Sequence, residues 1–232
     1  FVVASTEVSV MQLVAAPSDV LSKVCSEIEE SEIPQYGDIA SEMIDIMAKS
    51  DGAGLAAPQV GIDKRLIVLY GTMDEEGPSD PIVMINPEIS DLSGEVVAGV
   101  EGCLSVPIFR IPVERPSHVH VTALDVNGAR FEFQAEGFAA RCIQHEIDHL
   151  NGITLLDHLD DDTDSRYVVV PNSSVGLEES EDDEFPFVCI NVDGREDALG
   201  LYDEVFAEEA PDERFMRLLE RLVRRGELQF TD

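Results

Sequence analysis

The stretch QHEIDH, residues 144–149, decides what this chain of 232 residues is built around. Histidines four positions apart lie on one face of a helix, with their Cβ atoms about 5–6 Å apart. At that spacing His145 and His149 can bind one metal ion, and Glu146 between them can carry a proton. A helix is therefore predicted to follow Gly137 and to run to about Asn151. The alternative at this point is a pair of histidines packed on a partly buried helix.

Two upstream segments offer further candidates for the same site. The first is EGCLS, residues 101–105, in which the thiolate of Cys103 is a good ligand for zinc or ferrous iron. A cysteine beside glycine is, on its own, more often a small buried hydrophobe than a ligand. The second is GAGLAAPQVG, residues 52–61, whose glycines permit close approach of the main chain to a ligand. Gln59 in this segment can present its amide group as a hydrogen-bond donor.

In this order the three segments resemble the signature motifs of the peptide deformylases. The family pattern is Gly-hydrophobic-Gly-hydrophobic-Ala-Ala-x-Gln, then Glu-Gly-Cys-Leu-Ser, then Gln-His-Glu-x-Asp-His. Residues 52–59, 101–105 and 144–149 match every position that the pattern fixes. The resemblance covers roughly residues 10–160. It implies a metal-dependent hydrolase that removes the N-terminal formyl group from formylmethionine of newly synthesised polypeptides and releases formate.

The resemblance also implies the catalytic roles. Three residues would bind the metal and leave a fourth position for water, and Glu146 would act as general base and then as general acid. The side-chain amide of Gln59 and the backbone N–H of Leu104 would stabilise the oxyanion that forms at the formyl carbonyl. The implied metal ligands are Cys103, His145 and His149.

For the substrate, the resemblance implies an extended peptide that adds as a strand and is read mainly through its backbone. Phe138 and Cys142 would line the methionine pocket, and Glu101 would hydrogen-bond a ligand histidine from outside the metal site. Arg115 and Arg141 are candidates to pair with carboxylates of the site. The positions expected to contact the substrate are Ala53, Gly54, Gly102, Arg110, Phe138 and Cys142.

The metal and the function class each keep alternatives. Ferrous iron is the expected native metal, and zinc, nickel and cobalt are alternatives because a ligand set of two nitrogens and one sulfur suits all four. A metallopeptidase is a second possible class, since His-Glu-x-x-His alone serves it. A non-catalytic, metal-stabilised binding protein is a third, although a purely structural site needs neither an open position nor a proton carrier.

The charge of the chain limits its partners. Forty-eight acidic and fifteen basic residues give a net charge of −33, so direct DNA binding by the bulk surface is excluded. Adaptation to high salt and a general acidic bias both explain this composition. No apolar run reaches the roughly 20 residues of a membrane span, and the N-terminus lacks the basic flank of a secretory signal. A cytoplasmic protein is expected, in which the three cysteines not assigned to metal stay reduced.

The expected fold is α+β, with mostly antiparallel strands wrapped around a central metal-binding helix and a small C-terminal β/α extension. A helix is also predicted around the apolar stripe of residues 39–47, and a short one from Ser18. The expected strands are residues 65–70, 81–85, 95–100, 119–125 and 130–134.

Two regions are expected: a catalytic domain over residues 1–160, and an acidic linker with a small extension over residues 161–232. The extension is predicted to pair strands 167–170 and 187–191 and to end in a helix over residues 212–225. Five arginines fall on that helix, which predicts a transient contact with ribosomal RNA phosphate. The favoured alternative is that these arginines pair with the chain's own carboxylates or cover apolar surface.

Overall fold

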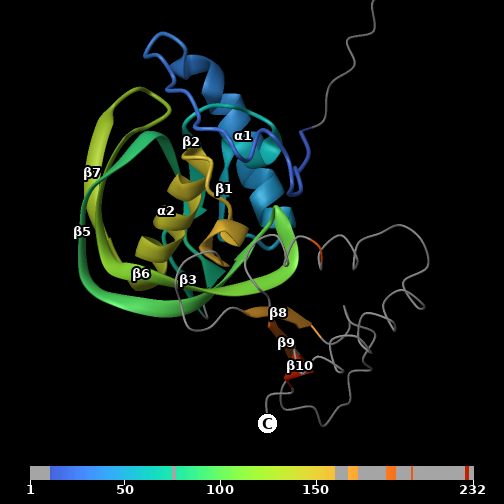
Figure 1. The fold of residues 1–232 in the computed structure, drawn as a ribbon. Helices are drawn as coiled ribbons and strands as arrows, with labels where there is room; N and C mark the ends of the chain where they lie inside the picture. The colour runs from blue at the N-terminus through green and yellow to red at the C-terminus, as the bar shows by residue number, and fades with distance from the viewer. Residues whose placement is uncertain are drawn as a thin grey trace, which may run out of the picture.

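The computed structural model describes residues 11–74, 77–159, 167–171, 187–191, 200 and 228–229. Within these residues every strand pair is antiparallel, and one large sheet has the order β1-β2-β5-β6-β8-β9-β10 with β7 also on β6 (Figure 1). Its strands are β1 (Gly54–Ala56), β2 (Leu66–Tyr70), β5 (Pro81–Cys103), β6 (Val106–Leu124), β7 (Arg130–Glu136), β8 (Tyr167–Pro171), β9 (Phe187–Asn191) and β10 (Leu228–Gln229). The short pair β3 (Met73–Asp74) and β4 (Gly77–Pro78) forms a sheet of its own.

In the part of the chain up to residue 159 that the structure describes, two α-helices and three short 3-10 helices accompany the sheet. These are η1 (Ile33–Gln35), α1 (Tyr36–Lys49), η2 (Ala57–Val60), α2 (Gly137–Leu150) and η3 (Leu155–Leu159). The antiparallel α+β class and both long helices are as predicted from the sequence. Among the described residues, no helix has the length and apolar character needed to cross a membrane.

Helices α1 and α2 cover opposite faces of β1 and β2 (Figure 1). Successive side chains of a strand point to opposite faces of the sheet. In β2, Ile67 and Leu69 therefore pack in the cluster that contains α2, whereas Leu66 and Val68 pack in the cluster that contains α1. The central strands are apolar on both faces because both faces are covered.

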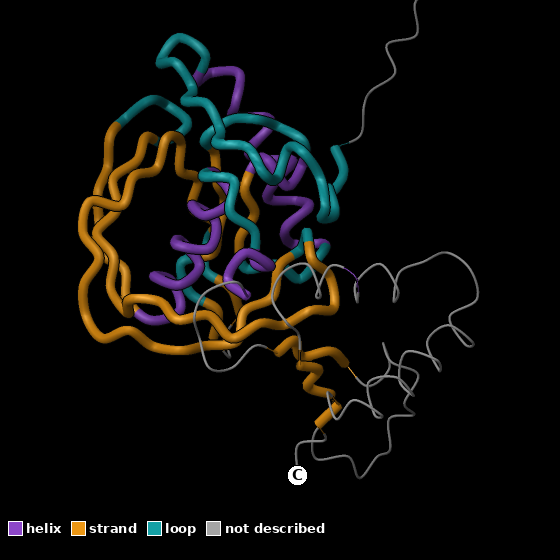
Figure 2. The backbone as a smooth tube through the Cα atoms, in the orientation of Figure 1, coloured by secondary structure: helices purple, strands orange, loops and turns teal. Residues whose placement is uncertain are grey.

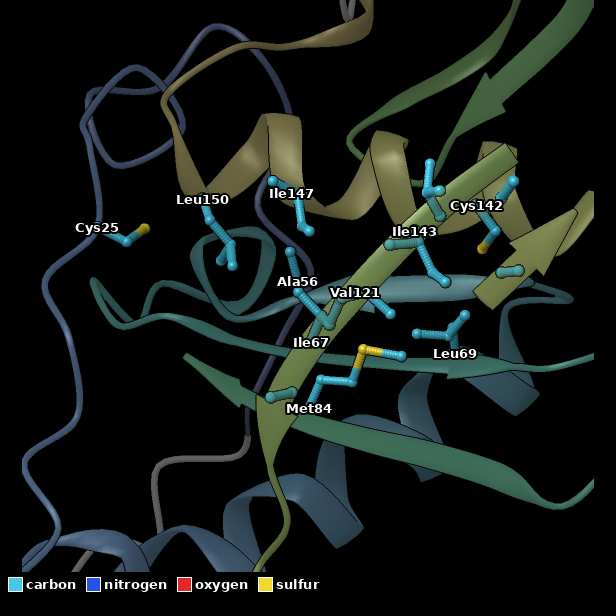
Figure 3. Packing of buried hydrophobic residues seen from close by; sticks show 14 residues of the cluster. Cys25, Ala56, Ile67, Leu69, Met84, Val121, Cys142, Ile143, Ile147 and Leu150 are labelled. Atoms are coloured by element: carbon cyan, nitrogen blue, oxygen red, sulfur yellow. The ribbon is translucent and has the colours of Figure 1, made fainter. Parts of the chain in front are cut away.

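Helix α2 lies inside the curve that β5, β6 and β7 describe (Figure 2). Its residues Ile143, Ile147 and Leu150 point towards the strands and contact a core that includes Met84 and Val121 (Figure 3). Most of the helix circumference is buried, and its other side carries the two histidines. The packing of the apolar side therefore fixes the position of the side that carries chemistry.

Strand β5 differs from the prediction, because residues 81–85 and 95–100 belong to one continuous strand. The polar residues between them look like a break in the sequence pattern. In the structure this stretch stays paired with β6. It contains three register shifts, between Ile85 and Glu88, between Ile89 and Asp91, and between Ser93 and Val96. Such bulges bend a strand and increase its twist, which lets β5 curve around α2.

The short helix predicted from Ser18 is wrong. Residues 18–21 form a hydrogen-bonded turn instead, because the chain then leaves to pair with the end of α2 through Cys25 N–H and Leu150 C=O. Strands β8 and β9 pair as predicted, and β8 meets β6 at Arg110 and Val169. The predicted helix over residues 212–225 lies outside the described residues.

Candidate active site

Three side chains with metal-ligating atoms meet at one point of the structure. The ligand atoms of Cys103, His145 and His149 all lie within 4.8 Å of one another, and all three residues are buried. Cys103 stands at the end of β5, and both histidines stand on α2. The Cys103 Sγ atom is 3.2 Å from His149 Nε2. One thiolate and two imidazoles in this arrangement suit a divalent transition metal.

The ring of His145 is oriented by a carboxylate outside the ligand group. Its Nδ1–H donates a hydrogen bond to Glu101 Oε2 at 2.8 Å, which leaves Nε2 free for a metal. Burial alone would raise the pKa of Glu101. Hydrogen bonds from His145 and Arg115, together with the charge of Arg115, outweigh burial and hold that pKa well below its usual range. Glu101 is therefore an anion that fixes the tautomer of the ring.

Cys103 is suited to act as a thiolate even before a metal ion binds. Burial raises the pKa of its thiol, but the charge of His149 and hydrogen bonds with His145 and His149 bring it well below the usual range. The thiolate is the form of cysteine that binds metals. The donor set therefore fits a metal in chemistry as well as in position.

Glu146 is a buried carboxylate in the pocket wall, with 3% of its surface exposed. Burial raises its pKa to about 7, with the charges of His145 and His149 acting in the opposite direction. Its Oε2 atom has no hydrogen-bond partner among the described residues. A carboxylate with a pKa near 7 can accept and return a proton at neutral pH.

Gly54 leaves room for this carboxylate. A Cβ atom at position 54 would stand 2.9 Å from Cys142 Sγ and would overlap Glu146 Oε1. The glycine at the start of β1 thus brings the backbone against the reactive side chain, which a larger residue would displace.

Gln59 presents its amide NH₂ group towards the same point. Its Oε1 atom accepts a hydrogen bond from Ala56 N–H at 2.8 Å, which sets the orientation of the amide. Its Nε2 atom then lies 3.5 Å from Cys103 Sγ and 3.3 Å from Ser105 Oγ. The donor is buried and held before any ligand arrives, as stabilisation of an oxyanion requires.

All the candidate residues named from the sequence, except His149 and Arg115, line one pocket of about 700 Å³. His149 is buried behind the pocket and contacts Cys103. Phe138 stands half-exposed in the pocket lining, and Cys142 is buried in its wall. Arg110 is exposed and lies against Gly102, where a Cβ atom would come within 2.7 Å of the guanidinium carbon.

Two residues that support the site were not predicted from the sequence. Ser105 accepts from Gln59 through its hydroxyl and from Ala16 N–H through its carbonyl. Asp148 accepts a hydrogen bond from Arg115 Nη1 at 2.8 Å. Both occupy positions that the motifs fix, so the motifs themselves held the signal. The predicted pairing of Arg115 and Arg141 with a site carboxylate is confirmed, since both contact Glu101.

Comparison with known proteins assigns the family. Residues 10–165 match the model of the family described as polypeptide deformylase. The peptide deformylase of Desulforudis audaxviator is 42% identical over 149 residues, which cover 64% of this chain and 93% of that protein. The peptide deformylase of Thermodesulfovibrio yellowstonii is 44% identical over 154 residues, which cover 65% of this chain and 90% of that protein.

A solved structure agrees with the sequence relatives. The class I type b peptide deformylase of Acinetobacter baumannii with bound Met-Ala-Ser is 36% identical, with a TM-score of 0.61 over 64% of this chain and 98% of that one. The chain therefore belongs to the polypeptide deformylase family, and it is an enzyme that removes the formyl group from the N-terminal methionine of newly made polypeptides.

Proposed function

We propose that this deformylase acts through one divalent metal ion held by Cys103, His145 and His149, with Glu146 as the proton carrier. The observation that carries the proposal is the meeting of one thiolate and two imidazoles beside a buried carboxylate with a pKa near 7. A structural metal site needs no such carboxylate and no adjoining pocket. The geometry therefore favours catalysis over metal-stabilised binding.

A metal bound by these three residues would supply an activated water, because a divalent ion lowers the pKa of a bound water from 15.7 towards about 7. Ferrous iron is our choice for the native ion. Zinc, nickel and cobalt also suit two nitrogens and one sulfur.

The chain's own residues carry the proton and the developing charge. Glu146 accepts a proton as the water oxygen attacks the formyl carbon, and it donates a proton to the methionine nitrogen as the C–N bond breaks. Formate and a free amino terminus leave. Gln59 Nε2 donates to the formyl oxygen as that atom gains negative charge, and the backbone N–H of Leu104 is the second donor.

The peptide is proposed to lie as an added strand between β1 and β5. Within the described residues β1 pairs only with β2, and the part of β5 beyond Ile85 pairs only with β6. Each therefore has an open edge, and Gly54 and Gly102 on these strands both line the pocket. Backbone pairing there would use Ala53, Gly54 and Gly102 and tolerate varied sequence after the methionine.

The methionine side chain would occupy the wall formed by Phe138 and Cys142, and Arg110 would contact a substrate carbonyl. All three residues line the same pocket as the ligand group. The relative from Acinetobacter baumannii binds Met-Ala-Ser, which supports an N-terminal methionine as the bound group.

The test is formate release from formyl-Met-Ala-Ser by anaerobically purified, iron-loaded protein. We expect one formate per free amino terminus and no cleavage between the amino acids. Internal cleavage would support the metallopeptidase alternative, and no turnover would support the binding protein. Glu146→Gln is expected to lose activity but keep one metal ion per chain. Loss of the metal in step with activity would contradict the role given to Glu146.

We further propose that residues 1–160 form the catalytic domain and residues 161–232 an extension. The family match over residues 10–165 supports this division. Transient ribosome contact through the C-terminal arginines, like the cytoplasmic location, stays a prediction. Sedimentation with ribosomes at low salt would test the contact in the full chain, compared with a variant carrying Arg217→Gln and Arg221→Gln. Equal sedimentation of the two would contradict it.

A further inference from the structure

Arg141 has no part in the chemistry proposed above, yet it stands on α2 one turn before His145. Its side chain is 20% exposed, and Nη1 donates to Glu101 Oε1 at 2.7 Å. The same guanidinium donates to Val113 C=O on β6 at 2.8 Å and to Val97 C=O on β5 at 2.6 Å. One side chain of α2 thus contacts β5, β6 and the Glu101 carboxylate that orients His145.

Gly99 on β5 makes space for this guanidinium. A Cβ atom at position 99 would lie between 2.8 and 3.0 Å from three atoms of the Arg141 guanidinium. Gly99 is not in the left-handed region of backbone conformation. The glycine is therefore needed for room and not for its backbone freedom, and alanine is compatible with the strand itself.

The carboxylate of Glu101 is fully occupied by its partners. Oε1 accepts from Arg115 Nε at 2.6 Å and from Arg141 Nη1, and Oε2 accepts from Arg115 Nη2 at 3.0 Å and from His145 Nδ1. Four donors use the roughly four lone-pair directions of a carboxylate. Without Arg141, one oxygen loses a donor and the carboxylate can turn about Arg115, which moves the acceptor that orients His145.

We propose that Arg141 is a positioning residue for deformylation. Its guanidinium packs against Gly99, and it fixes both the Glu101 carboxylate and the distance between β5 and α2. This inference rests on the metal site proposed above, because β5 supplies Cys103 and α2 supplies both histidines. Arg141 holds the strand at Val97, which lies five residues before Gly102 and six before Cys103. Its contacts therefore act on ligand geometry and on the edge of the pocket together.

The chain offers a matched control in Arg65. This arginine is also half-buried and also ties β5 to α2, since it donates to Pro87 C=O, to Leu150 C=O and to Asn151 Oδ1. Its contacts lie at the far end of the helix and include no carboxylate. Arg65→Met and Arg141→Met therefore each remove an arginine that links β5 to α2, and only Arg141 also contacts a carboxylate of the site.

The test titrates Co²⁺ into the metal-free protein and follows affinity and visible absorption, alongside kcat, KM and thermal unfolding. Loss of an outer partner of a metal ligand costs about 10–100-fold in metal affinity or activity. We expect Arg141→Met to bind Co²⁺ about tenfold more weakly, to change the Co²⁺ spectrum and to lower kcat about tenfold. Arg141→Lys is expected to recover part of the loss, because an ammonium can pair with Glu101 but cannot bridge the carbonyls.

Arg65→Met is expected to lower the unfolding temperature and leave the spectrum and kcat unchanged. If Arg141→Met matches Arg65→Met in spectrum, affinity and kcat, the inference is overturned, whatever the two unfolding temperatures are. The proposed function is tested separately, by formate release from the wild-type protein. If the wild-type protein releases formate and Arg141→Met has no effect, only the inference about Arg141 is overturned.

A double-mutant cycle checks the part assigned to Gly99. Gly99→Ala displaces the guanidinium, so it is expected to weaken Co²⁺ binding several-fold in the wild-type background and to have no effect in Arg141→Met. Equal effects in both backgrounds would overturn the link between the two residues. Gly37→Ala is the control, because a Cβ atom there meets nothing within 4 Å.

Discussion

Glu101→Gln is the change that tests the buried network most directly. The glutamine side chain has the same shape as glutamate but carries one acceptor oxygen and one NH₂ group. Its oxygen can still accept from two donors. Its NH₂ group must then face two other donors, which in the present geometry are Arg115 Nη2 and His145 Nδ1–H. Two charge-assisted hydrogen bonds are lost, and the buried Arg115 guanidinium keeps only the Asp148 carboxylate as a counter-ion.

The size of the effect follows from burial. The Glu101 side chain is 5% exposed and that of Arg115 is 6% exposed, so water cannot replace the lost acceptor. Hydrogen bonds to charged groups contribute about 1.5–3 kcal/mol each, and removing one member of a buried ion pair costs about 3–5 kcal/mol. We expect the free energy of unfolding to fall by about 4 kcal/mol. For a chain of this length that corresponds to a decrease in melting temperature of roughly 8–16 °C.

The assay is thermal unfolding of the metal-free protein by circular dichroism, followed by Co²⁺ titration. Metal-free protein is needed because a bound ion stabilises the fold by mass action and would mix the two effects. Co²⁺ affinity is expected to fall about 10–100-fold. Glu136→Gln is the control, since the Glu136 side chain is 83% exposed and, among the described residues, its one ion pair is with a surface histidine. Metal-free Glu101→Gln that melts within about 2 °C of wild type would refute the reasoning.

The remaining predictions concern the pocket and the thiols. Gln59→Leu is expected to lower kcat about 10²–10³-fold with little change in KM, as steady-state kinetics will show; a loss expressed only in KM would contradict an oxyanion role. Gly54→Ala is expected to abolish most activity while the protein stays folded by circular dichroism, because the added Cβ meets Cys142 Sγ at 2.9 Å; full activity would contradict it. Burial, with the nearby Asp63 carboxylate, raises the pKa of the Cys25 thiol to about 11, so its thiolate fraction at pH 8 is about 10⁻³ and rises only as pH approaches 11. A thiol reagent at pH 8 should therefore modify Cys103 in chelator-treated protein long before Cys25, and the reverse order by peptide mass mapping would refute this.

The two histidine ligands were predictable because their spacing is set within one helix. His145 and His149 lie on one face of α2 by helical period alone, and the structure places them there. Cys103 is different, since no local rule brings residue 103 to residue 145. Only the resemblance of three motifs in order predicted that meeting. The structure agrees with it, since the ligand atoms of the three side chains lie within 4.8 Å of one another.

The path of β5 was not predictable from local pattern. Asn86, Ser90, Asp91 and Ser93 interrupt the apolar alternation and indicate a loop. The structure keeps these residues in the strand because β6 supplies backbone partners on the other side of each bulge. Pairing with a strand more than twenty residues away therefore determines that these residues are extended. The local sequence pattern does not contain that information.

The role of Arg141 was only half predictable, for a related reason. An arginine on the helix that carries the site suggests an ion pair with a site carboxylate, and Arg141 makes that pair with Glu101. Its contacts with Val97 and Val113, and the space above Gly99, depend on how two strands curve past the helix. Side-chain roles that rest on backbone carbonyls of distant strands leave no trace in composition or periodicity.

The buried network explains why a site of this kind is built with charge instead of apolar packing. Glu101 and Asp148 balance Arg115 and Arg141, so the cluster is neutral as a whole, although each member is costly to bury alone. Well-packed apolar side chains in the same volume would often be as stable or more stable. They would not, however, orient the Nδ1–H of His145 or hold Nε2 towards the thiolate. The apolar face of α2 already fixes the helix through Ile143 and Ile147. The charged face therefore serves the geometry of the ligands, and its substitution should weaken metal binding in addition to destabilising the fold.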